Sequence, residues 1–382
     1  MKKLTVLHFV NLITGKSDGI FTHLLMIIRG VNRDKINIII AYQGNDIVDR
    51  VLRDEGIEYY HIPSLKDKIP LRAFPSLYKL IKLKQVDIIH SHNVKPYLIA
   101  GLVNILCRLR HIYNYNGVFI SDEYYNFFER IILKFNHRLI NIFNSVDVVI
   151  CPSKLSMAIL KDTSKFNCDI ISYYNGCTVE NPNNYFEAEF VEKLKRIGSK
   201  FKIIGVIGRL EKQKNPGFAL RIARELINRD PSIYFIFCGD GELKNEMILL
   251  SAKLNIEKNV LFTDYVKNVR YYFKFFHCLL FTSDWEGFPL TIWEAMAEGV
   301  PVVAQNVGGI SEILKEEKCG LVYQHGNINE AVNYLLTLIK NDAYKKELGQ
   351  KGKNLIREKY NAEQFYSFIN NLYLNSLNPF SK

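Results

Sequence analysis

Two carboxylates bracket the start of a short predicted helix in the C-terminal half of the chain. Glu286 and Glu294 lie on either side of the point, near Leu290, where a helical pattern begins. The first-turn amides of such a helix, here those of Leu290 and Thr291, have no intrahelical acceptor and form an anion site. A diphosphate bound there would bring the hydroxyls of one sugar nucleotide within reach of both acids. The alternative is structural: Glu286 complements the positive helix end, worth about 0.3–1 kcal/mol, and Glu294 is solvated.

Two cations that match a diphosphate follow the strand predicted at 201–208. Arg209 and Lys214 lie in the turn between this strand and the next helix, which Pro216 and Gly217 open. A guanidinium binds two phosphate oxygens at once, and an ammonium supplies a compact charge. Paired cations of this kind stabilise a leaving diphosphate without a metal ion, so we expect no metal and no cofactor. The alternative is a surface arginine and lysine in a polar loop.

Glycines stand at the ends of two predicted strands in the same half. Gly208 ends the strand at 201–208, and Gly239 and Gly241 frame the turn after the next strand. Glycine permits a tight turn and a close backbone approach. Because open α/β sheets bind ligands at the carboxyl ends of their strands, we expect these loops to line the same site.

Short apolar strands alternate with longer helical patterns along the chain. The strands are continuous apolar runs, which is typical of a parallel sheet buried on both faces. They are predicted at 4–10, 36–42, 86–92, 111–117, 147–153 and 170–176, and then at 201–208, 233–239, 259–265, 278–283, 301–305 and 320–324. This order predicts an α/β protein with two doubly wound sheets in series and a ligand in the cleft between them.

A polar segment at 178–200 interrupts the alternation. It contains Asn-Pro-Asn-Asn and a short charged helix pattern. We therefore predict an N-terminal domain at 1–177, a linker at 178–200 and a C-terminal domain at 201–360. Residues 361–382 are predicted to form a helix or tail that packs back on the N-terminal domain.

The charge and composition limit the partners. The 382-residue chain has a formal net charge of +11 but no dense Lys/Arg block and no base-reading motif, so we expect no nucleic-acid partner. A phosphate-bearing substrate or an anionic membrane surface fits this charge. No apolar stretch approaches the roughly 20 residues that span a bilayer, and the N-terminal apolar run is predicted as a buried strand rather than a secretion signal. Seven cysteines without a CxxC pair favour reduced thiols in a cytoplasmic protein.

One helical segment, at 122–143, mixes aromatic and aliphatic residues with basic ones. Arg130, Lys134 and Arg138 recur among phenylalanines and isoleucines. One interpretation is a helix packed on the N-terminal sheet. The other is a basic, aromatic face on the inner leaflet of the plasma membrane or on a lipid-linked acceptor, where each Lys or Arg is worth about 1 kcal/mol.

As a set, these motifs resemble those of the retaining family-4 glycosyltransferases of the GT-B fold. The stretches GRLEKQKN, CGDGEL, EGFPLTIWEAMAEGVPVVA and NVGGISEI occur in the order and with the spacing typical of that family. Glu286 and Glu294 match its E-x7-E motif. In the N-terminal half, DGIFTHLL, DIIHSH and the YNG at 174–176 also fit. The resemblance covers nearly the whole chain and implies two Rossmann-like domains that face each other across a cleft.

The resemblance implies metal-independent transfer of a hexose or N-acetylhexosamine, with retention, from a nucleoside-diphosphate sugar, with UDP favoured. The N-terminal domain would bind a glycan or lipid-linked acceptor in bacterial surface polysaccharide or glycolipid synthesis. Glu294 would hold the ribose hydroxyls and Glu286 the donor-sugar hydroxyls. Arg209 and Lys214 would bind the diphosphate. The other implied donor contacts are Gly19, Gly208, Gly239, Gly241, Tyr265, Gly287, Phe288, Pro289, Leu290 and Thr291.

Two departures from the family pattern concern the first loop and the acceptor proton. The family often has Gly-Gly and then Glu in this loop, whereas here Asp18 precedes Gly19 and Phe21 takes the Glu place. Many members carry a histidine where this chain has Asn116, whose amide cannot shuttle a proton at neutral pH. His92 is the nearest candidate base, and its alternative is a buried strand-end histidine. Without a base, the leaving phosphate would take the acceptor proton.

Three other functions compete with this interpretation. A GT-B enzyme that is not a transferase, such as a UDP-sugar epimerase, would lack the pair formed by Glu286 and Glu294. A nucleotide-dependent dehydrogenase is disfavoured because no GxGxxG follows the first strand. A non-catalytic carbohydrate or nucleic-acid binding module is the third. Release of nucleoside diphosphate from candidate donors would distinguish a glycosyltransferase from these three functions.

Overall fold

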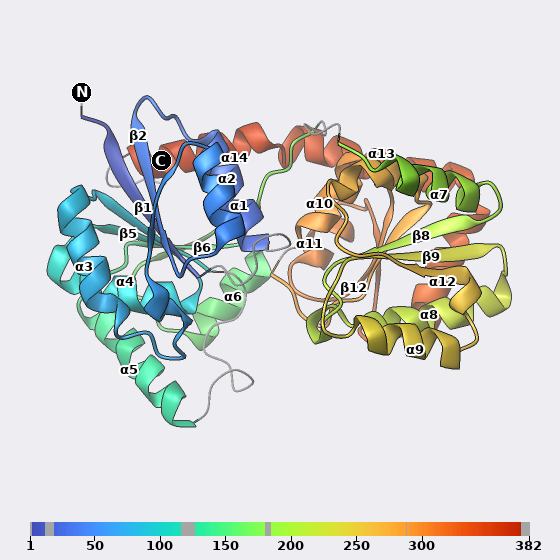
Figure 1. Ribbon diagram of the computed structural model, residues 1–382, viewed down its shortest axis with the longest axis horizontal. Helices are drawn as coiled ribbons and strands as arrows, with labels where there is room; N and C mark the ends of the chain where they lie inside the picture. Colours follow the sequence, from blue (N-terminus) through green and yellow to red (C-terminus); the bar gives the residue numbers. More distant parts are fainter. Residues whose placement is uncertain (1, 12–18, 116–126, 180–184, 288, 376–382) are drawn as a thin grey trace. The chain divides into compact units, whose positions relative to one another are not determined.

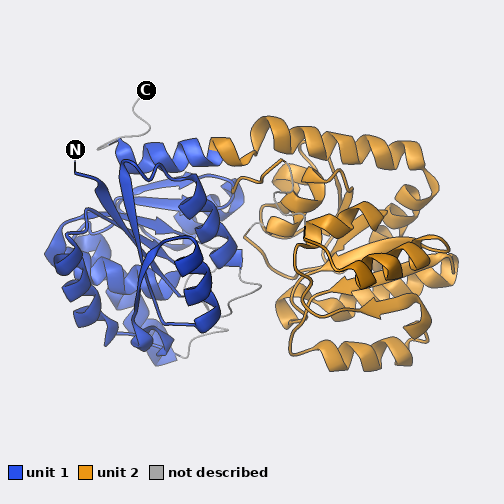
Figure 2. Cartoon of the chain, turned by 45° about the horizontal axis from the view of Figure 1, so that its top comes forward, with its two compact units in different colours: residues 1–174, 365–382 blue, residues 175–364 orange. Residues whose placement is uncertain are grey.

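The computed structural model describes residues 2–11, 19–115, 127–179, 185–287 and 289–375. The chain divides into two compact units (Figure 2). Unit 1 comprises residues 1–174 and 365–382, and unit 2 comprises residues 175–364. Each unit is a parallel sheet with helices packed against it (Figure 1).

Unit 1 is built on a seven-stranded sheet with the order β3-β2-β1-β4-β5-β6-β7. All of its strand pairs are parallel, and His8 on β1 is in register with His90 on β4. The strands are β1 (Leu4–Val10), β2 (Ile36–Tyr42), β3 (Glu58–His61), β4 (Ile88–His92), β5 (Arg110–Asn114), β6 (Val148–Cys151) and β7 (Asp169–Ser172).

Helices cover both faces of this sheet, which is why its central strands are apolar throughout. One face packs against α1 (Gly19–Gly30), α2 (Asp46–Asp54) and α14 (Ala362–Leu374). The other face packs against α3 (Ala73–Lys84), α4 (Val94–Cys107), α5 (Phe127–Ile142) and α6 (Lys154–Thr163). A short 3-10 helix, η1 (Pro63–Lys66), precedes α3.

Unit 2 is built on a six-stranded parallel sheet with the order β10-β9-β8-β11-β12-β13. Its strands are β8 (Lys202–Ile207), β9 (Ile233–Cys238), β10 (Val260–Phe262), β11 (Cys278–Phe281), β12 (Val302–Gln305) and β13 (Leu321–Tyr323). Its α-helices are α7 (Ala188–Gly198), α8 (Pro216–Arg229), α9 (Lys244–Lys253), α10 (Leu290–Ala297), α11 (Ile310–Leu314), α12 (Ile328–Lys340) and α13 (Asp342–Lys359). Its 3-10 helices are η2 (Lys212–Lys214), η3 (Glu257–Asn259) and η4 (Val269–Phe275).

The strand order of unit 2 creates a point where the winding of the chain reverses. From β8 the chain continues to β9 and β10 on one side, and then returns to β11 on the other side of β8. The loops after β8 and β11 therefore diverge at the carboxyl edge of the sheet. This switch point is where doubly wound sheets bind their ligands.

The predicted fold class is confirmed, since both units are parallel α/β sheets of the expected kind. The segment predicted as a linker contains α7, which packs on η4 through Phe190 and Tyr272, with ring centroids 4.8 Å apart. Helix α14 contributes Phe365, Ile369 and Tyr373 to the core of unit 1. Among the described residues, no helix combines the length and the hydropathy needed to cross a membrane.

Candidate functional site

An ion pair bridges the switch point of unit 2. Lys214, in η2 after β8, pairs with Glu286, in the loop after β11. The Lys214 ammonium also lies 5.4 Å from the centre of the Phe281 ring. The side chain of Glu286 is only 9% exposed and that of Lys214 is 21% exposed, so solvent screens the pair weakly. The sequence placed both residues in the site but did not indicate that they would contact each other.

Side-chain amides hold the two loops in place. Gln213 donates from Nε2 to the carbonyl of Trp285 at 3.0 Å, and Asn215 donates to the carboxylate of Asp284 at 2.9 Å. From β12, Gln305 donates from Nε2 to the carbonyl of Ser283 at 3.0 Å. These bonds join the carboxyl ends of the neighbouring strands β8, β11 and β12. They therefore fix the positions of the two loops that carry Lys214 and Glu286.

A small cavity opens beside this pair. It is lined at the strand ends by Gly208, Arg209, Lys214, Phe281, Thr282 and Ser283, among others. The hydroxyl of Ser283 is buried and has no hydrogen-bond partner among the residues that the structure describes. A buried hydroxyl without a partner is costly, so a ligand in the cavity would gain by bonding to it. Sequence reasoning missed Ser283 because no motif marks it.

Arg209 lies on the rim of this cavity. Its guanidinium pairs with Glu211 at 2.7 Å and lies 3.5 Å from the amide oxygen of Gln213. The side chain is 33% exposed, so it can leave this exposed pair for a stronger anion at little cost.

Helix α10 begins at the same edge of the sheet. Its N-cap is Pro289, which offers no side-chain acceptor to the amides of Leu290 and Thr291 at its first turn. Gly287 accepts a hydrogen bond from the amide of Gly309 at 3.2 Å, which ties the loop before α10 to the loop after β12. Phe288 lies outside the described residues.

Glu294 lies one turn into α10 in an unusual electrostatic environment. Burial raises the pKa of its carboxyl to about 7, the charge of Arg270 opposes this rise, and Glu298 adds to it. Burial raises the pKa of Tyr265, and the charge of Glu294 adds to the rise. Tyr265 therefore lies near Glu294, as expected if both contact one ligand.

Arg270 is a supporting residue that the sequence did not reveal. It is buried in η4, donates to Glu298 at 2.9 Å and to the carbonyl of Thr178 at 2.9 Å. It thereby ties α10 to the segment after β7 while remaining close to Glu294. Its only local signal is a single arginine within an aromatic run, which predicts nothing by itself.

Two glycines are required by contacts between loops of unit 2. A Cβ at Gly239 would collide with the carbonyl oxygen of Gly208, and one at Gly308 would collide with that of Glu286. A Cβ at Gly241 would lie 2.5 Å from the carbonyl oxygen of Leu210, which is also too close. At all three positions the close approach is between loops of unit 2, so the predicted contact of Gly239 and Gly241 with a ligand stays a prediction.

In unit 1, Gly19 begins α1. A Cβ there would meet no atom of the described residues within 4 Å, so packing against this part of the chain does not explain the glycine. The loop that precedes it, including Asp18, lies outside the described residues, as does Asn116. Phe21, at the place where the family has Glu, is buried in the core of unit 1.

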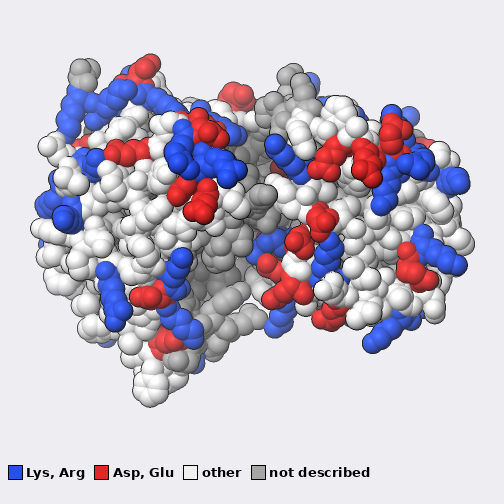
Figure 3. All heavy atoms as spheres, in the orientation of Figure 1, with Lys and Arg blue, Asp and Glu red and all other residues white. Residues whose placement is uncertain are grey.

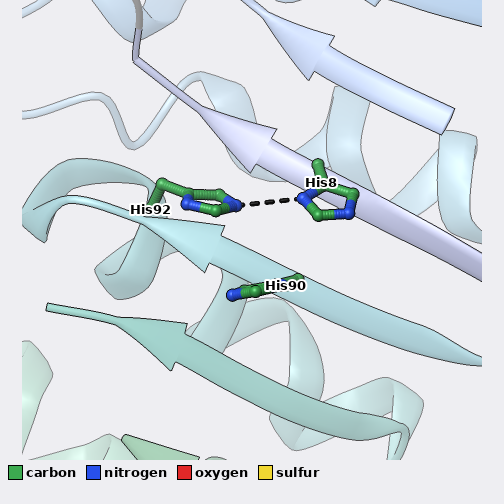
Figure 4. Close-up of side chains that lie close together, drawn as sticks. All are labelled: His8, His90 and His92. Carbon is green, nitrogen blue, oxygen red and sulfur yellow. Dashed lines mark hydrogen bonds between the residues drawn. The ribbon is translucent and has the colours of Figure 1, made fainter. Parts of the chain in front are cut away.

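His92 belongs to a buried group, the histidine cluster, formed with His8 and His90 (Figure 4). All three side chains lie on the sheet face covered by α1 and α14. His8 Nδ1 lies 3.0 Å from His92 Nε2, and the Tyr373 hydroxyl of α14 lies 2.6 Å from His90 Nδ1 and 3.3 Å from His8 Nε2. His92 has no exposed surface, which argues against direct contact with an acceptor and for the buried strand-end alternative.

The histidine cluster is neutral near pH 7. Burial lowers the pKa of His8 to about 3 and holds those of His90 and His92 well below the usual value, with neighbouring histidines adding to the effect. Among the described residues, this is the group whose side chains could together hold a metal ion, since their ligand nitrogens lie within 4.8 Å of one another. Four of their six ring nitrogens are hydrogen-bonded, while His90 Nε2 and His92 Nδ1 have no partner among the described residues. Within the described part of the chain no carboxylate joins the group to balance a divalent charge, so the geometry fits a hydrogen-bonded network better.

The two-unit fold is that of the GT-B glycosyltransferases. The crystal structure of Anabaena Alr3699/HepE in complex with UDP-glucose superposes with a TM-score of 0.79 over 96% of this chain and 98% of that chain, at 18% identity. The crystal structure of TarM superposes with a TM-score of 0.76 over 98% and 99% of the two chains, at 16% identity. These similarities concern the fold alone.

Sequence comparison then gives the family. Residues 188–355 match the family described as glycosyl transferases group 1, and residues 17–181 match glycosyltransferase family 4. Together the two matches cover most of both units. The two matches together indicate a family-4-like glycosyltransferase of the GT-B fold, whereas the retaining mechanism stays a prediction.

Two relatives are named as transferases that act on diphosphoundecaprenol-linked sugars. The chain is 25% identical, over 84% of each sequence, to the UDP-Gal:alpha-D-GlcNAc-diphosphoundecaprenol alpha-1,3-galactosyltransferase of Escherichia coli. It is 28% identical, over 49% of this chain and 48% of the relative, to the N-acetylgalactosamine-N,N'-diacetylbacillosaminyl-diphospho-undecaprenol 4-alpha-N-acetylgalactosaminyltransferase of Campylobacter jejuni.

Proposed function

We propose that this protein transfers a hexose or N-acetylhexosamine, with retention of configuration, from a UDP-sugar to a lipid-linked or glycan acceptor in bacterial surface polysaccharide or glycolipid synthesis. One observation carries the proposal: the ion pair of Lys214 and Glu286 bridges the switch point beside the start of α10 and the cavity that Ser283 lines. This edge offers cations and amides to a diphosphate, and carboxylates to the sugars on either side of it.

The donor would lie along this edge of unit 2. The diphosphate would bind Arg209, Lys214 and the first amides of α10, and Glu294 would accept hydrogen bonds from the ribose diol. Glu286 would face the donor sugar. A lysine ammonium has three donors, so Lys214 can keep Glu286 in position while it also bonds to a phosphate oxygen.

The proton of the acceptor hydroxyl has to leave during transfer. The acceptor O–H bond breaks, the bond from C1 to the acceptor oxygen forms, and the bond from C1 to the phosphate oxygen breaks on the same face of the sugar. We assign the proton to that departing phosphate oxygen, since His92 is buried and bonded to His8. The protein then contributes position and charge stabilisation, with no metal ion.

A donor screen tests this proposal. UDP-, GDP- and ADP-sugars are incubated with the protein and a diphosphoundecaprenol-linked sugar, and release of nucleoside diphosphate is measured with and without EDTA. We expect release from a UDP-sugar that EDTA does not change, and an α-linked product from an α-linked donor by NMR. Inversion of configuration would overturn the retaining mechanism, and loss of activity in EDTA with rescue by Mg²⁺ would overturn metal independence. Formation of an epimerised free nucleotide sugar would overturn transfer as the reaction.

A further inference from the structure

Helix α5 of unit 1 presents an apolar face to solvent. Phe128 is 75% exposed, Phe127 is 64% exposed and Phe135 is 59% exposed. Isoleucines extend the same face along the helix: Ile131, Ile132 and Ile142. These side chains recur at spacings of three, four and seven residues, so they form one continuous stripe, here called the α5 stripe.

The opposite side of α5 is firmly packed. Leu133 and Ile140 are buried in the core of unit 1, and Ile140 fills the space that Gly101 leaves on α4. The Tyr97 hydroxyl of α4 lies 2.6 Å from His137 Nδ1. Because these contacts fix the rotation of the helix, the stripe faces outward as a property of the fold rather than of a loosely held helix end.

The charges beside the stripe are predominantly positive. Lys134 and Arg138 are exposed on α5. The acid of this helix, Glu129, pairs with Lys68 at 3.2 Å, which cancels its charge. Figure 3 shows mostly uncharged surface at the lower tip of unit 1, where Figure 1 places the start of α5, with both basic and acidic side chains above it. An apolar stripe bordered by cations complements an anionic lipid surface, whose headgroups are negative and whose interior is apolar.

We propose that the α5 stripe docks unit 1 on an anionic membrane, with the helix lying in the plane of the interface. The phenylalanines and isoleucines enter the boundary between headgroups and acyl chains, and Lys134 and Arg138 remain at the phosphates. The inference deepens the proposed function, because a lipid-linked acceptor lies at the same surface.

Vesicle binding by the full-length protein tests the proposal. The probe is a set of vesicles of phosphatidylcholine alone and of phosphatidylcholine with an equal part of phosphatidylglycerol, measured by co-sedimentation. We expect binding to the anionic vesicles that weakens as NaCl rises, since the screening length falls to about 3 Å at 1 M. The triple variant Phe128→Ser/Ile131→Ser/Phe135→Ser should bind at least about tenfold more weakly. Neutralising Lys134 and Arg138 should weaken binding to anionic vesicles roughly fivefold per residue at low salt.

A matched control separates the stripe from exposed apolar surface in general. Leu249, on α9 of unit 2, is 65% exposed, and Leu249→Ser should leave vesicle binding unchanged. A Phe128→Trp variant should show blue-shifted emission and quenching by brominated lipid, which adsorption by charge alone would not produce. Circular dichroism and nucleotide binding confirm that each variant is folded.

Two results would overturn the proposal. One is equal vesicle binding by the wild type and the triple variant. The other is a wild type that forms a dimer in solution and does not bind vesicles, together with a triple variant that is monomeric. The stripe would then be covered by a second copy of the chain. Neither result affects the proposed use of the donor, because release of nucleoside diphosphate from the donor in lipid-free solution tests unit 2 by itself.

Discussion

Lowering the pH from 8 to 6 should weaken binding of the donor nucleotide about tenfold, and Glu294 should account for the change. Its pKa of about 7 in the empty protein means that the carboxyl is about nine-tenths ionised at pH 8 and about one-tenth ionised at pH 6. Only the carboxylate accepts hydrogen bonds from both ribose hydroxyls with its full charge. The tenfold loss corresponds to about 1.4 kcal/mol.

Calorimetric titration at pH 6, 7 and 8 measures this effect directly. The ligand is the nucleotide sugar that binds most tightly in the donor screen, because its diphosphate is esterified at both ends and does not titrate in this range. Glu294→Gln should bind roughly 1–3 kcal/mol more weakly at pH 8 and should show little dependence on pH. If the variant keeps the wild-type slope, another group titrates and the assignment of Glu294 to the ribose is wrong.

The same variant should have the opposite effect on the stability of the empty protein. A carboxyl whose pKa rises on folding, here from 4.5 to about 7, favours the folded state most below pH 4.5, and this contribution is lost as the pH rises through 7. Glu294→Gln should therefore raise the free energy of unfolding at pH 8, by at most about 3 kcal/mol, and leave it nearly unchanged at pH 4.5. Urea denaturation at both pH values measures the difference, and an equally large change at pH 4.5 would refute the electrostatic origin.

Three further outcomes follow from the contacts within each unit. Lys214→Ala and Glu286→Gln should each lower turnover, and the double variant should lose less than the sum of the two single losses, expressed as activation free energies. The reason is that each single change leaves its partner weakly solvated and without its counter-charge. Additive losses would show that the pair is not coupled. Unfolding free energy should fall as the pH drops below 6.5, by about 1.4 kcal/mol per pH unit for each neutral buried histidine, and His8→Gln should reduce that slope in urea titrations. Gly239→Ala should lower the melting temperature more than Gly326→Ala, because only the former adds a collision with a neighbouring carbonyl to its positive φ.

The fold was predictable because its strongest signals are local. The apolar runs predicted at 4–10 and 36–42 coincide with β1 and β2, since both strands are buried almost throughout. Strand β3 was missed: its sequence, EYYH, has polar ends and lies half exposed at the edge of the sheet. An edge strand needs little apolar surface, so its pattern does not differ from that of a loop.

The donor site was predictable only in outline. The loops that carry Lys214 and Glu286 have recognisable motifs, but their ion pair joins residues far apart in the chain and depends on β8 and β11 being neighbours. Arg270, Ser283 and Gln305 left no signal, because a buried polar residue is identified by its partners, or by the lack of one, and these appear only in three dimensions.

The two proposals rest on different units, and this separation gives the combined results their meaning. Donor binding depends on strand ends within one sheet of unit 2, whose register the neighbouring strands fix. Membrane docking depends on the outward face of one helix of unit 1. If nucleotide binding follows the titration of Glu294 while the α5 stripe ignores lipid, a water-soluble glycan becomes the favoured acceptor. If both hold, the acceptor is anchored at the surface where unit 1 docks, and transfer to a diphosphoundecaprenol-linked sugar should be faster on anionic vesicles than in detergent solution.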